Sequence, residues 1–166
     1  EFDASHSYYV GLIKLAYKKN NKEVNLVFAP YMPQKRALQE LQTERMIDIY
    51  WAGIDAARAS QLSVVNIPLI KGLLGFRVFI THQENLRKLE QVTTLSDLKK
   101  LSLCQGSHWP DTNIMLAAGL NVLPNPIYEN MFSQTYIKRC DAFPRGINEA
   151  MSEYQARKIV MPELAL

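Results

Sequence analysis

Residues 98–120, LKKLSLCQGSHWPDTNIMLAAGL, decide the fold class. The apolar run that ends at Gln105 indicates a short strand, and the segment from Pro110 to Gly119 has helical spacing with a glycine as its stop signal. Between them, Gly106 allows a tight turn, and Pro110 suits the first position of a helix. A strand that passes through a tight turn into a helix is the repeating unit of α/β proteins.

This turn is also a candidate binding site. The first amides of a helix lack intrahelical acceptors and lie at the positive end of the helix dipole, so they attract anions. The backbone amides from Ser107 to Asp111 are therefore predicted to contact a ligand, with His108 and Trp109 beside them. A plain strand–helix turn is the alternative, in which the Trp109 ring covers the turn instead of stacking on a ligand.

The rest of the chain repeats the alternation of strands and helices. Helices are predicted at 8–19, 33–45, 110–119, 129–139 and 147–158, with a shorter one at 93–101 whose cap is Thr94 or Ser96. Strands are predicted at 24–29, 47–53, 63–70, 75–82, 101–105, 121–128, 140–146 and 158–166. The predicted fold class is α/β, with parallel-rich sheets covered by helices on both faces.

Composition and charge exclude several classes of function. The chain has 166 residues, of which 48% are hydrophobic and 21% charged, as expected of a globular protein. The formal net charge is +3, and the basic residues form no block or aromatic–basic stripe, so a nucleic-acid partner is not expected. The longest apolar stretch, IPLIKGLLGFRVFI, is interrupted by charges and glycines, and so predicts no membrane span.

The cysteines and histidines predict neither a metal site nor a cofactor. His6, His82 and His108 are scattered, without the spacing of metal ligands. Cys104 and Cys140 are too few for a disulfide framework, and two interpretations stay open: a pair in an oxidising compartment, or two buried free thiols.

A nucleophilic enzyme is not expected either. Cys104, His108 and Asp111 are residue types of a nucleophile, a base and an orienting acid. However, Cys104 belongs to the predicted strand and His108 follows the turn, so their side chains need not meet. The carboxylates are scattered over predicted surface helices and do not indicate a paired-carboxylate site.

Four segments together resemble a known family. IPLIKGLLGFRVFI (67–80), TLSDLKKL (94–101), QGSHWPDTNIM (105–115) and DAFPRGINEA (141–150) resemble the type 2 periplasmic solute-binding fold. The nearest group is the bacterial family-3, amino-acid-type extracellular solute-binding proteins. The resemblance implies two lobes around a ligand cleft, with lobe 1 at 1–74, lobe 2 at 75–160, and hinge strands at about 75–82 and 159–166. Lobe 1 is expected to be incomplete, because the family's first strand and its final return into lobe 1 are largely missing from this sequence.

The resemblance and the strand ends give further candidate ligand-binding residues. Family members often carry an arginine near the position of Arg58 that clamps a ligand carboxylate; a solvated loop arginine is the alternative. Tyr9 lies where the family uses aromatic contacts. Trp51 and Gly53 end the strand predicted at 47–53, and aromatic residues at strand ends often wall a cleft.

Arg145 is the most informative departure from the family. At this position the resemblance implies an Asp that holds the ammonium group of an amino acid. An arginine would repel an ammonium group and attract a carboxylate or phosphate. A polar or anionic ligand is therefore expected, with Arg145, Asn148 and Glu149 facing the cleft; salt bridges at the surface are the alternative reading of these three residues.

The function implied by the resemblance is recognition of a small-molecule ligand without turnover. The chain is expected to be a monomeric, periplasmic solute-binding domain of an ABC transporter, with its secretion signal outside this sequence. The alternative is the ligand-sensing domain of a membrane signalling protein, such as a histidine kinase or a diguanylate cyclase. An enzyme on the same fold, or a domain that has lost its ligand, would be rarer outcomes.

Overall fold

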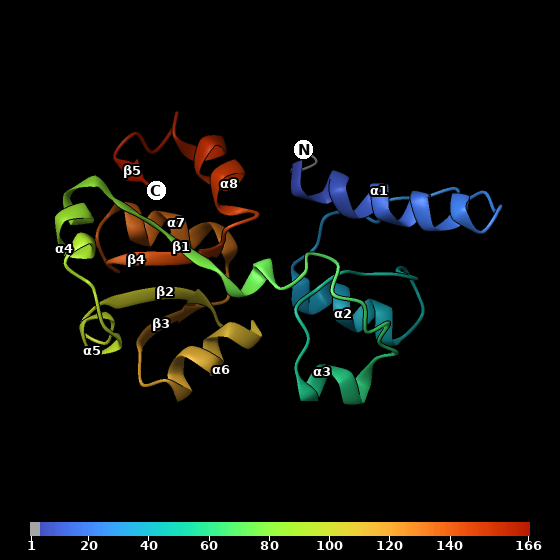
Figure 1. The fold of residues 1–166 in the computed structure, drawn as a ribbon, viewed down its shortest axis with the longest axis horizontal. Coiled ribbons are helices and arrows are strands. Elements are labelled where there is room, and N and C mark those ends of the chain that lie inside the picture. Colours follow the sequence, from blue (N-terminus) through green and yellow to red (C-terminus); the bar gives the residue numbers. More distant parts are fainter. Residues whose placement is uncertain (1–3) are drawn as a thin grey trace. The chain divides into compact units, whose positions relative to one another are not determined.

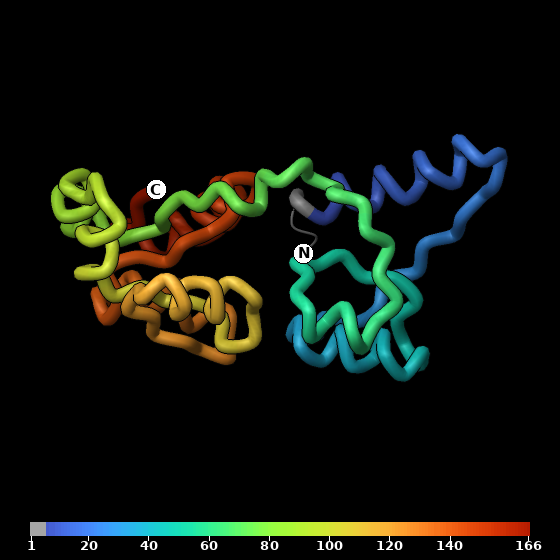
Figure 2. Tube along the Cα trace, turned by 60° about the horizontal axis from the view of Figure 1, so that its bottom comes forward, coloured from blue at the N-terminus to red at the C-terminus, as the bar shows by residue number. Residues whose placement is uncertain are grey.

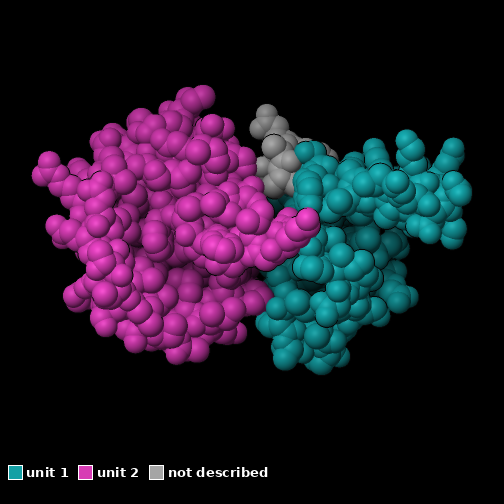
Figure 3. Space-filling model, in the orientation of Figure 1, with its two compact units in different colours: residues 1–69 teal, residues 70–166 magenta. Residues whose placement is uncertain are grey.

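The computed structural model describes residues 4–166, with side chains from residue 6 onward, and divides the chain into two compact units (Figure 3). Unit 1 comprises residues 1–69 and unit 2 comprises residues 70–166. Within the described part of the chain, no helix has the length and apolar character needed to cross a membrane.

Unit 1 is built from helices joined by irregular segments. Its helices are α1 (Ala4–Lys19), α2 (Gln34–Gln42) and α3 (Ala56–Gln61). The predicted helices at 8–19 and 33–45 are confirmed as α1 and α2, whereas α3 was not predicted. Asp55 starts α3, because its side chain accepts a hydrogen bond from the backbone N–H of Arg58 at 2.8 Å.

The three strands predicted in unit 1, at 24–29, 47–53 and 63–70, are wrong. The described residues of this unit contain no strand, and its apolar runs lie open to solvent: Val27 is 85% exposed and Val65 is 81% exposed. A strand is stable only when a neighbouring strand pairs with its backbone and a second layer covers its apolar face. The apolar runs of unit 1 have neither.

Unit 2 contains one five-stranded sheet, in the order β3-β2-β4-β1-β5 (Figure 1). The strands are β1 (Arg77–His82), β2 (Ser102–Gly106), β3 (Asn121–Asn125), β4 (Ala142–Gly146) and β5 (Leu164–Ala165). β2 pairs in parallel with β3 and β4, while β1 pairs antiparallel with β4 and β5. The expected α/β class with parallel strand pairs is confirmed, and β1 and β5 give the sheet a mixed character.

Helices cover both faces of this sheet, as the trace in Figure 2 also shows. They are α4 (Leu86–Glu90), α5 (Leu95–Leu98), α6 (Pro110–Ala117), α7 (Tyr128–Tyr136) and α8 (Ala150–Arg157), with short 3₁₀ turns at Leu73–Gly75 and Gln83–Asn85. Thr94 caps α5 in a capping box with Asp97, which confirms one of the two predicted caps. The predicted terminal strand at 158–166 is reduced to β5.

The core of unit 2 follows the alternation of side chains along each strand. In neighbouring pairs such as Phe79–Ile80 and Leu103–Cys104, the first side chain packs on one face and the second on the other. One face holds a cluster around the fully buried Phe132 of α7, and the opposite face holds a smaller cluster around Leu101. The unit is therefore a three-layer α/β/α sandwich.

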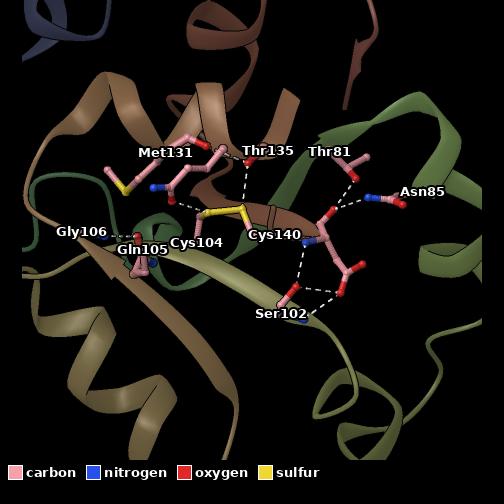
Figure 4. Close-up of a disulfide and its surroundings, with 11 residues drawn as sticks. Thr81, Asn85, Ser102, Cys104, Gln105, Gly106, Met131, Thr135 and Cys140 are labelled. Carbon is pink, nitrogen blue, oxygen red and sulfur yellow. Dashed lines mark hydrogen bonds between the residues drawn. A yellow bond between two sulfur atoms is a disulfide. The ribbon is translucent and has the colours of Figure 1, made fainter. Parts of the chain in front are cut away.

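A disulfide lies inside the larger cluster and settles the question that the sequence left open (Figure 4). Cys104 of β2 is bonded to Cys140, which lies two residues before the start of β4, and both residues are fully buried. The Cα atoms are 5.7 Å apart, within the usual range for disulfides. The bond joins adjacent strands across 36 residues of sequence.

Candidate functional site

The topology of unit 2 gathers charged and aromatic side chains at one edge of its sheet. β2 and β4 are parallel, so the segments that follow them leave the sheet at the same edge. β1 is antiparallel to β4, with Arg77 beside Gly146, so the start of β1 lies at that edge as well. We call the side chains gathered there the edge cluster: Arg77, Trp109, Asp111, Tyr128, Arg145, Glu149 and Glu153.

Arg145 is at the centre of the edge cluster and is only 6% exposed. Its Nε and Nη2 atoms donate to the two carboxylate oxygens of Glu153, each at 2.6 Å, in a bidentate pair. Its Nη2 atom also lies 2.9 Å from Oε1 of Glu149. Burial by itself lowers the pKa of Arg145, but the hydrogen bonds and charge of Glu153 outweigh it and hold that pKa above its usual value.

Three aromatic rings surround the Arg145 guanidinium. Its carbon atom Cζ lies 4.8 Å from the ring centre of Trp109, 5.1 Å from that of Phe143 and 5.6 Å from that of Tyr128. Contacts of this kind stabilise a desolvated cation. Burial, together with the charge of Glu153, raises the pKa of the Tyr128 hydroxyl far above its usual value, so Tyr128 stays protonated at neutral pH.

Arg77 connects the loops that follow β2 and β4. Its Nη2 atom pairs with Oδ1 of Asp111, at the start of α6, and its Nη1 atom lies 3.9 Å from Oε1 of Glu149. Glu149 also accepts a hydrogen bond from the backbone N–H of Gly146 at 3.2 Å. Burial raises the pKa of the Glu149 carboxyl, although the charge of Arg145 lowers it.

The turn after β2 needs a glycine because a ring crosses it. A Cβ atom on Gly106 would lie 2.4 Å from Cδ2 of Trp109, so no other residue fits without moving that ring. The amides of Ser107 and Trp109 donate to the carbonyls of Asn125 and Gly106, both at 3.0 Å, and Pro110 has no N–H. The amides of Ser107 and Trp109 are therefore used within the fold.

Unit 1 holds a second group of candidate residues, which we call the aromatic cluster. The Tyr9 ring of α1 stacks on Trp51 with 5.2 Å between ring centres, and Tyr50 stacks on the same ring at 6.2 Å. His6 lies 5.5 Å from Trp51, and Tyr8 packs edge-on against Tyr9. The ring of Trp51 is therefore held between neighbours and is half-buried.

Arg58 lies in the same unit and has a defined orientation. Its Nη1 atom donates to the Gly53 carbonyl at 2.6 Å, and its Nη2 atom donates to Oε1 of Gln34 at 2.9 Å. Burial raises the pKa of the nearby Tyr50 hydroxyl, and its hydrogen bond with Gln34 and the charge of Arg58 partly oppose that rise. Gln34 thus links Arg58 to the aromatic cluster.

No protein-family model and no curated protein sequence matches the chain. Solved structures do match it. An ancestral arginine-binding protein bound to arginine superposes with a TM-score of 0.59 at 16% identity, and the match covers 95% of this chain. An ancestral arginine-binding protein bound to glutamine gives a TM-score of 0.61 at 16% identity and 95% coverage. Arginine-bound truncated ArgBP from T. maritima gives a TM-score of 0.58 at 16% identity and 94% coverage.

This is the type 2 solute-binding fold. The chain spans 66% of the length of either ancestral structure and 68% of the truncated ArgBP. At this level of identity the likeness establishes the fold alone. The family resemblance of the sequence is borne out at the level of fold, and so is the α/β class.

Within the solute-binding fold, the predicted site residues fall into separate groups. Trp109, Asp111 and Arg145 come together in the edge cluster; Ser107 and the exposed His108 lie in the turn beside it. Tyr9 and Trp51 stack in the aromatic cluster, and Arg58 contacts Gly53. The ligand-binding roles of all nine residues remain predictions.

Three members of the edge cluster were missed by sequence reasoning. Arg77 lies at the start of a strand, and only the antiparallel pairing of β1 with β4 places it at this edge. Tyr128 and Glu153 lie within helices α7 and α8, where they surround Arg145. A buried arginine requires a carboxylate partner. Glu153 follows Arg145 closely enough in sequence for one turn and the start of a helix to bring the two side chains together, so the sequence did contain a signal for this pair.

The chemistry available to the edge cluster is hydrogen bonding and charge recognition. Cys104 is in a disulfide and fully buried, so it offers no thiolate nucleophile. Within residues 4–166, no group of three or more His, Cys, Asp or Glu side chains is arranged to hold a metal ion.

Proposed function

We propose that the chain binds a small polar solute through the edge cluster, and that it acts as a binding protein and not as an enzyme. The observation that carries this proposal is the position of the edge cluster at the carboxyl ends of β2 and β4, where α/β sheets bind ligands. Arginine-binding proteins of the same fold, one bound to arginine and one bound to glutamine, support a small polar ligand.

The contacts of Arg145 within the edge cluster support a role in ligand binding. Arg145 is compensated by two carboxylates, and we propose that it orients Glu149 and Trp109 for the ligand. The sequence-based expectation that Arg145 itself attracts an anionic ligand is the competing proposal. Trp109 supplies aromatic surface for stacking.

We further propose an extracytoplasmic, periplasmic location and an ABC transporter as the receiver of the solute. The buried disulfide supports an oxidising compartment, since structural disulfides form in secreted and periplasmic proteins and are rare in the cytosol. Co-purification with a membrane permease after cross-linking in the presence of the solute would test the partner.

The decisive experiment is thermal unfolding against a panel of amino acids, dicarboxylates, phosphorylated metabolites and short peptides. A solute that binds the native state adds about 2.7 kcal/mol of stability at a hundredfold excess over its dissociation constant. We expect a concentration-dependent rise in the melting temperature with at least one class of solute. Asp111→Asn should weaken that response, whereas the same change at Asp97, in the capping box of α5, should leave it unchanged.

If no solute in the panel raises the melting temperature, the proposed function is wrong. If the Asp97→Asn variant loses the response as fully as the Asp111→Asn variant, the edge cluster is not the binding site.

A further inference from the structure

The positive charge of the chain is concentrated at the carboxyl end of α1. Four lysines lie within nine residues there, and we call them the lysine cluster: Lys14, Lys18, Lys19 and Lys22. Glu23 follows them, so residues 14–23 have a formal charge of +3, which equals the net charge of the whole chain. The chain has 19 basic and 16 acidic residues in total, so 15 of each remain elsewhere and cancel. One short segment of unit 1 therefore carries the entire excess of positive charge.

The fold gathers lysines that the sequence leaves interspersed with uncharged residues. Lys14 and Lys18 are four residues apart in α1 and therefore lie one turn apart on the same face. After α1 the chain turns back on itself (Figure 1): Asn21 takes a left-handed backbone with φ of 53°, and the N–H of Lys22 donates to the carbonyl of Tyr17 at 3.0 Å. This is a Schellman motif. It brings three lysines around one open hollow of about 620 Å³, which is lined by Lys14, Lys18, Asn21, Lys22, Glu23 and Val24.

The ammonium groups of the lysine cluster have no partner of opposite charge. Within the described part of the chain, none of the four forms an ion pair or donates a hydrogen bond, although Glu23 lines the same hollow. In unit 2, by contrast, Lys88 pairs with Asp141 at 2.6 Å. Like charges four residues apart on a helix destabilise it, so an anionic partner would be stabilising here.

Helix capping does not account for the lysine cluster. Cations interact favourably with the helix dipole only within the last turn, and Lys14 lies five residues before the end of α1. The carbonyls at this end are already used. That of Tyr17 accepts from the N–H groups of Asn20 and Lys22, each at 3.0 Å, and that of Ala16 accepts from the Asn20 side chain at 2.8 Å. The ammonium groups are therefore available to an external partner.

Apolar side chains border the lysine cluster on the same exposed surface. Because an α-helix turns by about 100° per residue, Leu15 and Tyr17 lie on the two sides of the row of lysines on α1. Leu15 is 49% exposed and Tyr17 is 41% exposed. On the opposite side of the helix, Leu12 and Ile13 are partly buried. Lysines bordered by exposed leucine and tyrosine are typical of helices that lie on anionic membrane surfaces.

We propose that the lysine cluster, with Leu15 and Tyr17, is a docking surface for a bilayer that contains anionic phospholipids. The ammonium groups contact lipid phosphates, and the two apolar side chains lie at the level of the headgroups. Nucleic acid is the less suitable partner, because the basic residues outside this segment are balanced by acidic ones and form no extended basic track. The docking surface lies in unit 1 and the edge cluster in unit 2, so this proposal goes beyond solute binding.

Co-sedimentation of the full chain with vesicles tests the charge preference. We expect binding to vesicles of equal parts phosphatidylglycerol and phosphatidylcholine, and none to vesicles of phosphatidylcholine alone. Added salt should release the chain, because it shortens the distance over which charges interact. Inorganic phosphate should release no more of the chain than chloride does at equal ionic strength, since the docking surface spans several headgroups.

Two double variants locate the charges that matter. Lys14→Gln with Lys18→Gln should weaken binding to the mixed vesicles about thirtyfold, at about fivefold for each lysine. The matched control, Lys35→Gln with Lys99→Gln, removes the same number of charges from exposed positions elsewhere. It should bind within about twofold of wild type, because charges beyond the screening distance contribute little. Circular dichroism should show unchanged helix content, since glutamine has nearly the helix propensity of lysine.

Leu15→Ser separates a bilayer from a soluble polyanion. It should weaken binding to the mixed vesicles severalfold, because the bilayer offers an apolar layer to this exposed side chain. Binding of the same variant to a short DNA duplex should equal that of wild type, because a phosphate backbone offers no such layer.

Each result supports or overturns the docking surface. Failure to sediment with anionic vesicles at low salt overturns it, and so does an equal loss in the two double variants. Tighter binding to the DNA duplex than to vesicles at equal phosphate concentration, or specific release by inorganic phosphate, overturns the bilayer as the partner. None of these outcomes affects the proposed solute binding, which is measured without membranes.

Discussion

Unit 2 and unit 1 differ most in how far their apolar side chains are buried. In unit 2, Phe132 and Phe143 are fully buried between a paired sheet and the helices on one face. In unit 1, Ala37 is the only buried hydrophobic residue among those described, and Phe28 is 51% exposed. A hydrophobic core is the main source of folding stability, so the two units should differ in stability within one chain.

The comparison teaches that an apolar run becomes a strand only where the chain supplies a partner for it. The run at 24–29 in unit 1 and the run at 101–105 in unit 2 look alike in sequence, but only the second has parallel neighbours on both sides. Helices need no such partner for their backbone hydrogen bonds, and accordingly α1 and α2 form in unit 1 as predicted.

The largest expected effect on stability comes from truncating one phenylalanine in each unit. Phe132→Ala should destabilise unit 2 by about 3–5 kcal/mol, because it opens a cavity in the core. Phe28→Ala should change the stability of unit 1 by no more than about 0.5 kcal/mol. The chain has one tryptophan in each unit, so urea unfolding followed by Trp109 in a Trp51→Phe background reports on unit 2, and the reverse background reports on unit 1. Equal losses would contradict the difference between the cores.

The disulfide should contribute nearly as much, and only to unit 2. Replacing Cys104 and Cys140 together by Ala removes a link that closes 36 residues, for which the chain-entropy relation gives about 3–4 kcal/mol. The urea midpoint reported by Trp109 should fall, while the midpoint reported by Trp51 should not move. A parallel fall of both midpoints would mean that the two units unfold as one and that their stabilities cannot be separated.

Sequence reasoning succeeded in unit 2 because the local signals there agree with one another. The helix signals at Pro110 and Gly119, the cap at Thr94 and the apolar runs all indicated elements that the structure contains. The three-layer arrangement followed from their alternation. The antiparallel direction of β1 and β5 could not be predicted, since it is set by the path of the chain between strands and not by a local pattern of residues.

The candidate site was predictable only in part, for a similar reason. Trp109, Asp111 and Arg145 stand next to strand ends, and any α/β topology brings such positions to a common edge. Arg77 reaches that edge through antiparallel pairing, and Asn148 and Glu149 lie over Gly146 because of the path of one loop. Neither arrangement has a periodic signature in the sequence.

The smallest effect expected is electrostatic, and it compares the same substitution in the two units. Asp141 of unit 2 accepts hydrogen bonds from the backbone N–H and hydroxyl of Ser102, at 2.8 and 3.0 Å, and pairs with Lys88 at 2.6 Å. Asn can satisfy only part of this set, so Asp141→Asn should destabilise unit 2 by about 1–2 kcal/mol at pH 7. Asp55→Asn in unit 1 should be nearly neutral, because Asn is as good a helix cap as Asp.

The pH dependence of the stability difference between wild type and Asp141→Asn shows whether the charge of Asp141 causes it. Burial raises the pKa of the Asp141 carboxyl, but its hydrogen bonds with Lys88 and Ser102 outweigh that effect and lower the pKa below its usual value. A carboxyl whose pKa is lower in the folded state stabilises the fold above its unfolded pKa of about 3.9 and loses that contribution as the pH falls through the folded pKa. The stability difference between wild type and Asp141→Asn should therefore be full at pH 7 and shrink below about pH 4. Urea unfolding at pH 7 and pH 3, read from Trp109, measures both values. A difference that is the same at both pH values would mean that the substitution acts through packing and not through the charge of Asp141.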